Sequence, residues 1–233
     1  RRAKGKLINL EAVLRENPLE GHIGLGHTRW ATHGKPSERN AHPHRAGSVV
    51  IVHNGIIENY RALRTELEAS GAEILSDTDT ELIAHLIDGR IREGKDLMTA
   101  VRESCAQLVG SYALGAMSDT DPAHIVAAKN GGSPIIVGQG EKQAFLGSDI
   151  PAILPYTREM ITLWDGDFAL LSANGLEIVD IEGSSVERDF MTIQWDPVSA
   201  ERGGYDHFMQ KEIFEQPRAI TDTIGTRVNE AEL

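Results

Sequence analysis

The chain has 233 residues, a length that suits one large domain or two small ones and that can bury a sizeable core. Apolar residues make up 40% and the net charge is −12, which argues against non-specific nucleic-acid binding because such binding needs a basic face. No apolar run approaches the roughly 20 residues that cross a bilayer, and the single cysteine, Cys105, excludes an intrachain disulfide. We therefore expect a cytoplasmic protein that binds neither nucleic acid nor a membrane.

The first unusual segment is the histidine-rich stretch from His27 to His44. Four of the nine histidines lie in it, and glycines and prolines interrupt it, so we expect a binding loop rather than a helix or a strand. Arg29 offers a planar fork for a carboxylate, and the neighbouring Trp30 offers an apolar wall. The alternatives are a solvated loop without a function and a metal site.

The metal alternative rests on four histidines that could ligate zinc, which are His27, His33, His42 and His44. No cysteine lies near them, and their spacing matches none of the usual zinc frameworks. We therefore predict no metal and no other cofactor.

A β-branched run, 48–53, predicts a buried strand that ends in a turn at Asn54-Gly55. The side-chain amide of Asn54 and the backbone N–H of Gly55 are neutral donors, and such a pair can hold a developing oxyanion. The alternative is a hairpin, because Asn-Gly is a strong hairpin signal. Against a tight hairpin, residues 56–60 lead into a helical pattern rather than into a returning strand.

Two helices are predicted next. Tyr60, Leu63 and Leu67 mark the apolar face of the first. The second opens at the acidic run 77–81, where Thr78 or Thr80 can cap it and Gly94 suggests its end. In that run one aspartate can cap the N-terminus of the helix while the other binds a substrate ammonium group.

A third predicted helix carries Leu97, Val101, Cys105 and Leu108 on one apolar stripe. The cysteine is the only candidate thiol nucleophile in the chain, but no basic residue within a turn of it would lower its pKa. We expect Cys105 to be a core residue rather than a catalytic one.

The later half of the chain is mostly strand, with candidates at 124–128, 134–138, 143–147 and 168–171. Strands come in groups rather than alternating with helices, which favours a layered α+β fold. A polar, irregular segment follows Trp195, and residues 206–217 predict a last helix that stops at Pro217.

Four of these segments, in this order, resemble glutamine:fructose-6-phosphate aminotransferase, also called glucosamine-6-phosphate synthase. They are His27-Thr28-Arg29-Trp30-Ala31-Thr32-His33-Gly34, His53-Asn54-Gly55-Ile56-Ile57-Glu58-Asn59, Ser76-Asp77-Thr78-Asp79-Thr80-Glu81 and Met209-Gln210-Lys211-Glu212-Ile213-Phe214-Glu215-Gln216-Pro217. The resemblance covers nearly the whole chain. Amidophosphoribosyltransferase is similar over a shorter His-Thr-Arg and an Asn-Gly, but not over the complete motifs.

The resemblance implies an α+β fold, a four-layer αββα sandwich of the N-terminal-nucleophile hydrolase type, and a transferase that hydrolyses L-glutamine to glutamate and ammonia for transfer to fructose 6-phosphate. It implies that Arg29 binds the α-carboxylate of glutamine and Asp79 its α-ammonium group. Asn54 and Gly55 would form the oxyanion hole. It also implies that Trp30, Thr32 and His33 belong to a loop that folds over glutamine, with Trp30 gating an ammonia channel.

The family begins with a catalytic N-terminal cysteine in a Cys-Gly-Ile sequence, and this chain begins after the corresponding position. We therefore expect the sandwich to be incomplete at its N-terminus and this fragment alone to be inactive. The resemblance implies that residues 1–198 form a type 2 glutamine amidotransferase domain and that residues 199–233 begin the connection to a sugar isomerase domain. That domain would be the partner of the chain, in a full-length protein that we expect to be a homo-oligomer.

Two other functions remain open at this point. The chain could be a non-catalytic module that binds glutamine or a partner domain. It could also be the glutaminase domain of another type 2 amidotransferase, such as amidophosphoribosyltransferase, with a different acceptor.

Overall fold

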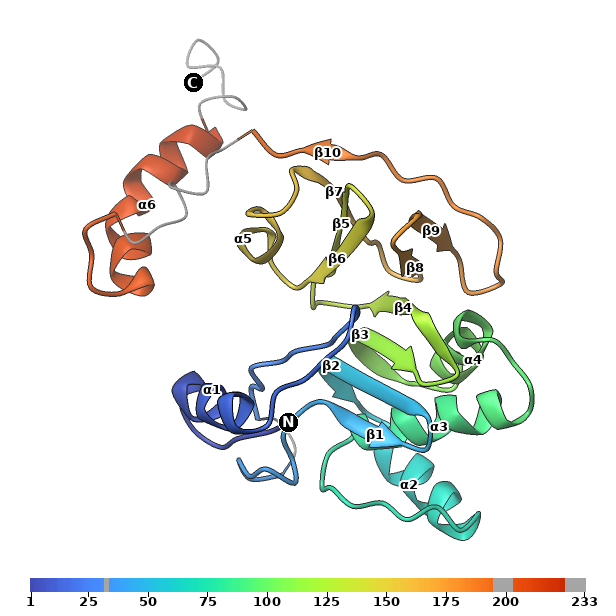
Figure 1. The fold of residues 1–233 in the computed structure, drawn as a ribbon. Helices are drawn as coiled ribbons and strands as arrows, with labels where there is room; N and C mark the ends of the chain where they lie inside the picture. Colours follow the sequence, from blue (N-terminus) through green and yellow to red (C-terminus); the bar gives the residue numbers. More distant parts are fainter. Residues whose placement is uncertain (32–33, 195–202, 225–233) are drawn as a thin grey trace. The chain divides into compact units, whose positions relative to one another are not determined.

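The β-branched run lies in the second strand of a six-stranded antiparallel sheet. The computed structural model describes residues 1–31, 34–194 and 203–224 (Figure 1). Strand β2 (Val49–Ile57) pairs with β1 (His44–Ala46) on one side and with β3 (Gly110–Ser118) on the other. The sheet continues through β4 (Asp121–Asn130), β8 (Phe168–Ser172) and β9 (Gly175–Val179).

A second antiparallel sheet has four strands in the order β10 (Met191–Thr192), β7 (Glu159–Thr162), β5 (Ile136–Gly140) and β6 (Gln143–Gly147). The two sheets share one apolar core. Val137 and Ile161 of the four-stranded sheet pack there with Ala169 and Leu171 of the six-stranded sheet. This core makes the two sheets a sandwich.

Three helices cover the outer face of the six-stranded sheet: α2 (Tyr60–Ala69), α3 (Thr80–Arg92) and α4 (Leu97–Cys105). Their apolar faces pack on β1 to β4 in a second core that includes Leu82, Ile83 and Val101, all fully buried.

On the four-stranded sheet, Val137 points into the core between the sheets, so the next residue, Gly138, points outward. A Cβ on Gly138 would lie 2.7 Å from Ile153 of the short helix α5 (Ile150–Ile153), which therefore covers that outer face.

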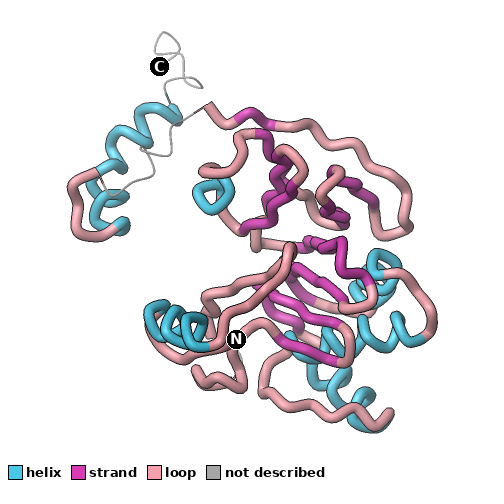
Figure 2. Tube along the Cα trace, in the orientation of Figure 1, coloured by secondary structure: helices cyan, strands magenta, loops and turns pink. Residues whose placement is uncertain are grey.

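The predicted α+β sandwich with two antiparallel sheets is confirmed. Helix α1 (Leu7–Glu16), which the sequence analysis does not predict, has no buried residue. After it the chain runs to β1 without a helix or a strand in the residues that the structure describes there, 17–31 and 34–43, as expected for the histidine-rich loop (Figure 2).

Contacts divide the chain into the units Arg1–Thr192 and Ile193–Leu233. The predicted boundary at 198/199 lies outside the described residues.

Two details of the predicted elements are wrong. Strand β2 does not end at Asn54-Gly55 but continues to Ile57, with Asn54 opposite Ala113 and Gly55 opposite Tyr112 on β3. The pair is therefore neither a turn nor a hairpin, because the ladder with β3 supplies partners that the local sequence does not reveal.

The last helix, α6 (Phe208–Ile224), contains Pro217 instead of stopping there. Proline fixes φ near the helical value and removes one backbone N–H, so a helix can continue past it with one hydrogen bond fewer. None of the helices in the described parts of the chain is long and apolar enough to span a membrane.

A methyl group on Gly55 would test the path of β2. Gly55 has φ of +136°, and a Cβ there would lie 2.1 Å from the carbonyl oxygen of Ser111 on β3. We expect Gly55→Ala to lower the free energy of unfolding by about 1–3 kcal/mol, measured by urea denaturation, because the strand must move or adopt a strained backbone. The matched control is Gly132→Ala, where no atom lies within 4 Å of the added Cβ. Equal stability of the two variants would contradict the close approach of β2 and β3.

Candidate functional site

A pocket of about 340 Å³ opens where the histidine-rich loop, the end of β2 and the start of α3 meet. Its volume lies within the range of about 300–1,000 Å³ that small-molecule sites occupy. The residues that line it are Arg29, Trp30, His42, His53, Asn54, Gly55, Ile56, Thr78, Asp79, Thr80, Ser111 and Ser133. The structure thus brings together Arg29, Trp30, Asn54, Gly55 and Asp79, which the sequence analysis singles out. Thr32 and His33 lie outside the described residues.

Arg29 supplies the positive charge of the pocket. Its Nη2 donates to the carbonyl oxygen of Gly34 at 3.1 Å and its Nη1 to that of Lys35 at 3.4 Å, so backbone groups of its own loop hold the guanidinium group. Burial lowers the pKa of Arg29 from its usual value, and the carboxylate of Asp79 opposes this shift. Arginine stays charged under all ordinary conditions, so the pocket keeps one cation. The next residue, Trp30, is 90% exposed.

Asp79 supplies the negative charge. It is buried, and its Oδ2 accepts the backbone N–H of Ile57 at 2.9 Å. It immediately precedes α3, where the helix dipole favours a carboxylate. Asp77 is exposed and bonds to Asn40 and Arg39 instead. The two aspartates of the acidic run therefore have different surroundings, and Asp79 is the one at the pocket.

Neither of the two threonines that the sequence suggests as caps occupies the N-cap position of α3, which is Asp79. The hydroxyl of Thr78, one residue earlier, accepts the backbone N–H of Glu81 at 3.4 Å. The other candidate, Thr80, faces the pocket, and its hydroxyl lies 3.1 Å from Nε2 of His42 and 3.1 Å from Nδ1 of His53.

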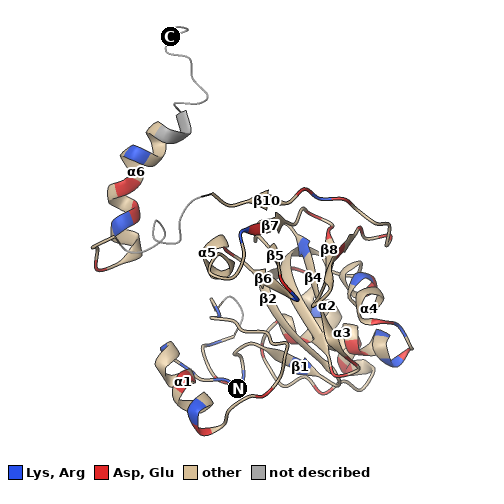
Figure 3. Ribbon diagram, turned by 45° about the horizontal axis from the view of Figure 1, so that its top comes forward, with Lys and Arg blue, Asp and Glu red and all other residues tan. Residues whose placement is uncertain are grey.

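Neutral donors come from β2, which contains no Lys, Arg, Asp or Glu (Figure 3). Strand β3, with which it pairs, contains none either. His27 Nε2 lies 2.7 Å from Oδ1 of Asn54. A carboxamide oxygen only accepts, so His27 carries its proton on Nε2 and donates it. This contact fixes the carboxamide orientation, and the amide N–H groups of Asn54 can then donate to a ligand in the pocket that Asn54 lines. The sequence around His27 does not predict this role, because a contact across 27 residues has no local signal.

His42, which lines the pocket, and His44 next to it are neutral. The ring centroid of His42 lies 4.2 Å from that of His27 and 5.0 Å from that of His44. Burial, reinforced by His27 and the other nearby basic groups, lowers the pKa of His42 to about 2. Burial and then Arg2 lower the pKa of His44 to about 4, although Glu81 opposes this. Burial also lowers the pKa of His27.

Cys105 lies in the core between α4 and the six-stranded sheet, as predicted. Burial raises its pKa to about 12, so the thiol is neutral at ordinary pH. As for a metal, no group of three or more potential ligands occurs within the described residues. His42 and His44 are instead within hydrogen-bond distance of threonine hydroxyl groups.

This arrangement suits a zwitterion with a polarised carbonyl. A cation and a buried anion line one pocket, and uncharged amide donors on β2 line the same pocket. Hydrogen bonds between the charged groups of the pocket and the charged groups of an amino acid are stronger and more directional than hydrogen bonds between neutral groups. Neutral donors can then stabilise an oxygen that gains charge during a reaction.

Comparisons with known proteins show the family to which the chain belongs. A family model described as "Glutamine amidotransferase domain" matches residues 27–155. The chain is 49% identical over 229 residues to "Glutamine--fructose-6-phosphate aminotransferase [isomerizing]" of Clostridium acetobutylicum, covering 97% of this chain and 37% of that protein. A protein of the same name from Thermus thermophilus is 46% identical over 98% of the chain and 37% of its own length. The chain therefore spans little more than a third of these relatives.

Among solved structures, glutamine phosphoribosylpyrophosphate amidotransferase from B. subtilis, complexed with ADP and GMP, is similar with a TM-score of 0.55 and 26% identity. The similarity covers 66% of this chain and 34% of that one.

The buried neutral histidines predict a loss of stability in mild acid. The pKa values of these histidines are lower in the folded chain than in the unfolded chain. Their contribution to the free energy of unfolding is therefore complete above the unfolded pKa of about 6.5 and is lost as the pH falls. Between pH 7 and pH 5, His42 and His44 bind protons in the unfolded chain but not in the folded chain. The free energy of unfolding should fall by about 2 kcal/mol for each of the two, measured by urea denaturation. His42→Gln should remove about half of this pH dependence, and an unchanged pH dependence would contradict the assignment.

Proposed function

Because this chain belongs to the glutamine amidotransferase domain family, we propose that it forms the glutamine-hydrolysing part of an enzyme that transfers ammonia to fructose 6-phosphate. The name of the relatives that are 46–49% identical supports this acceptor. In the proposal, a sugar isomerase domain of the same protein accepts the ammonia, and the full-length protein is a cytoplasmic homo-oligomer. The observation that carries the proposal is the pairing of Arg29 with the buried Asp79 in one pocket beside Asn54 and Gly55.

In this site Arg29 binds the α-carboxylate of L-glutamine and Asp79 binds its α-ammonium group. Both ends of the amino acid are then fixed, and its side-chain amide extends toward β2. Trp30, together with Thr32 and His33 of the same loop, covers the bound glutamine. A free amino acid offers these two charges on one carbon atom, which distinguishes it from a glutamine residue within a peptide.

Asn54 and Gly55 stabilise the tetrahedral intermediate. The nucleophile in this proposal is the N-terminal cysteine that the family resemblance implies, with its own α-amino group as the base. Its sulfur bonds to the amide carbon while the thiol proton passes through the amino group to the leaving nitrogen, which departs as ammonia. Water then hydrolyses the thioester to glutamate. The negative oxygen in each step accepts hydrogen bonds from the Asn54 amide and the Gly55 N–H.

The main alternative acceptor is a phosphoribosyl group, as the name of the similar solved structure suggests. That structure is 26% identical over 66% of this chain, against 49% over 97% for the sugar-phosphate relative, which favours fructose 6-phosphate. The other alternative is a module that binds glutamine without chemistry. Glutamine hydrolysis by the protein that carries the N-terminal cysteine distinguishes an enzyme from such a module.

Charge removal in the pocket tests the binding roles. We expect Asp79→Asn and Arg29→Gln each to weaken L-glutamine binding by about 10- to 100-fold in calorimetric titration, because each removes one charge-assisted hydrogen bond. The asparagine in Asp79→Asn keeps an oxygen that can accept the N–H of Ile57, so the fold should survive this change. The matched control is Asp119→Asn, an exposed aspartate in the turn between β3 and β4 that does not line the pocket, which should bind glutamine like the unaltered chain. Equal affinity of all three variants would refute the assignment.

Removal of the Asn54 carboxamide tests the oxyanion role. In the protein that carries the N-terminal cysteine, Asn54→Ala should lower the turnover of glutamine by about 10²–10³-fold. Because Asn54 lies within a paired strand rather than a turn, the change should cost only about 1 kcal/mol of stability, for the lost contact with His27. A variant with full turnover would leave Gly55 as the sole candidate donor.

A further inference from the structure

Resting on the proposed function, we propose that Asn40 is a positioning residue that sets the separation between Arg29 and Asp79 and thereby selects an amino acid with both charges. Asn40 does not line the pocket. It lies between the loop that holds Arg29 and the segment that leads to Asp79, and it bonds to both.

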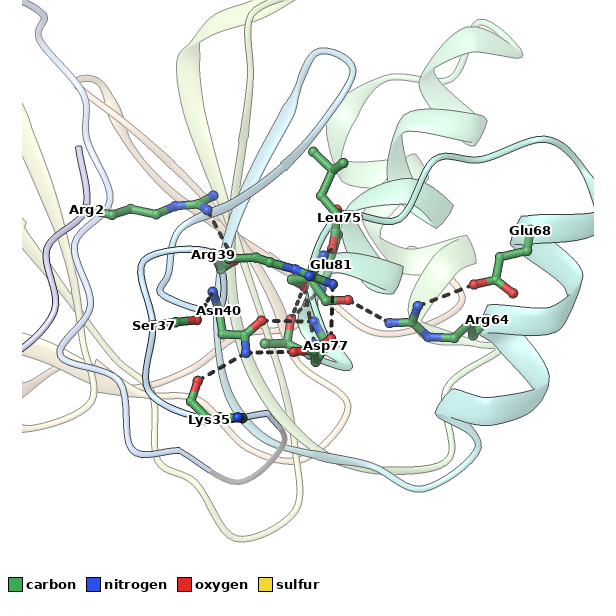
Figure 4. Close-up of polar contacts among 12 residues, drawn as sticks. Arg2, Lys35, Ser37, Arg39, Asn40, Arg64, Glu68, Leu75, Asp77 and Glu81 are labelled. Carbon is green, nitrogen blue, oxygen red and sulfur yellow. Dashed lines mark hydrogen bonds and ion pairs between the residues drawn. The ribbon is translucent and has the colours of Figure 1, made fainter.

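Asn40 is 2% exposed, and its carboxamide is nearly saturated with hydrogen bonds. Its Nδ2 donates to the carbonyl oxygen of Lys35 and to Oδ2 of Asp77, both at 3.1 Å, and its Oδ1 accepts the backbone N–H of Asp77 at 3.0 Å (Figure 4). A buried amide with three hydrogen bonds has one favourable orientation. The contact therefore fixes the distance between the Lys35 backbone and the Asp77 backbone.

On the cation side, the contact continues directly to Arg29. The carbonyl oxygen of Lys35 accepts from both Asn40 and Arg29, and that of Gly34 accepts the second Arg29 nitrogen. Gly34 has φ of +74°, and a Cβ there would lie 2.6 Å from Nδ2 of Asn40. The chain at Gly34 thus lies against Asn40, and a displacement of Asn40 displaces the oxygen atoms that hold the guanidinium group.

On the anion side, the segment 75–79 is fixed to α3. The carboxylate of Glu81 accepts the backbone N–H groups of Leu75 and Ser76, and the guanidinium group of Arg64 donates to the carbonyl oxygen of Ser76 at 2.8 Å. Asp79 follows two residues after Asp77. Asn40 therefore connects a loop to a segment that the helices already hold in place.

Such a connection matters most for a ligand that uses both charges at once. The carboxylate and the ammonium group of an α-amino acid have a fixed separation, so both are bound well only when Arg29 and Asp79 are held at the matching distance. A preorganised site avoids the entropy cost of arranging its charges on binding. The affinity of a ligand with only one of the charges does not depend on that distance.

The test compares L-glutamine with two single-charge ligands, glutaramic acid, which lacks the ammonium group, and 4-aminobutanamide, which lacks the carboxylate. Asn40→Asp keeps the size of the side chain but places a carboxylate against the Lys35 carbonyl and the Asp77 carboxylate. We expect the dissociation constant for L-glutamine to rise about tenfold, within the range for residues coupled through one hydrogen-bond network. The constants for both single-charge ligands should stay within about twofold. Titrations followed by NMR measure all three.

A compensating exchange separates positioning from damage. In the double variant Asn40→Asp/Asp77→Asn, the new amide at position 77 can donate to the new carboxylate at position 40, which removes the repulsion between two carboxylates. The Lys35 carbonyl still receives no hydrogen bond from position 40, so L-glutamine affinity should recover only in part. Asp96→Ala is the stability control, because it removes two hydrogen bonds to Thr99 at the start of α4, away from the pocket, and should leave all three ligands unaffected. If Asn40→Asp does not fold, Asn40→Ser, which is too short to reach both partners, replaces it.

The outcomes are distinct. Glutamine affinity that is unchanged in Asn40→Asp, or that falls in parallel with that of the single-charge ligands, would overturn the positioning role while leaving the glutamine site intact. Absence of glutamine binding by the unaltered chain would instead contradict the proposed function itself.

Discussion

One hydrogen bond joins the parts of the site, the one from the backbone N–H of Ile57 to the carboxylate of Asp79. Ile57 is the last residue of β2, and Asp79 immediately precedes α3. The bond therefore ties the buried anion to the strand that carries Asn54 and Gly55. Everything else in the pocket is placed relative to this junction: Arg29 by the loop that Asn40 fixes to Asp77, and the Asn54 carboxamide by His27.

The division of charge follows from where each residue lies. Strands β2 and β3 carry no Lys, Arg, Asp or Glu, so they offer only neutral donors. The two charges come from the edges, one from a loop and one from a helix N-terminus. His42 and His44 stay neutral because burial depresses the pKa of each, and they therefore add no second cation beside Arg29. One cation and one anion match the two opposite charges of an amino acid better than two cations would.

The sequence predicts the parts of this structure that local patterns encode. The apolar periodicity of 82–91, the β-branched run of β2 and the core position of Cys105 all follow from spacing and residue type. The course of β2 through Asn54-Gly55 could not be predicted, because it depends on pairing with β3, more than 50 residues later. The contacts of His27 and Asn40 likewise span 27 and 37 residues. The motifs thus indicate which residues form the site, while long-range contacts determine how they are oriented.

The most direct test of the central claim, that Arg29, Asp79 and the Asn54-Gly55 pair form one glutamine site, is an NMR titration of the ¹⁵N-labelled chain with L-glutamine. We expect saturable shifts of the Gly55 backbone amide, the Asn54 side-chain amide and the Arg29 Nε–H, all with one dissociation constant. Shifts confined to the separate hollow between α2 and α3, around Gly71, His85 and Arg90, or no shifts at all, would contradict it.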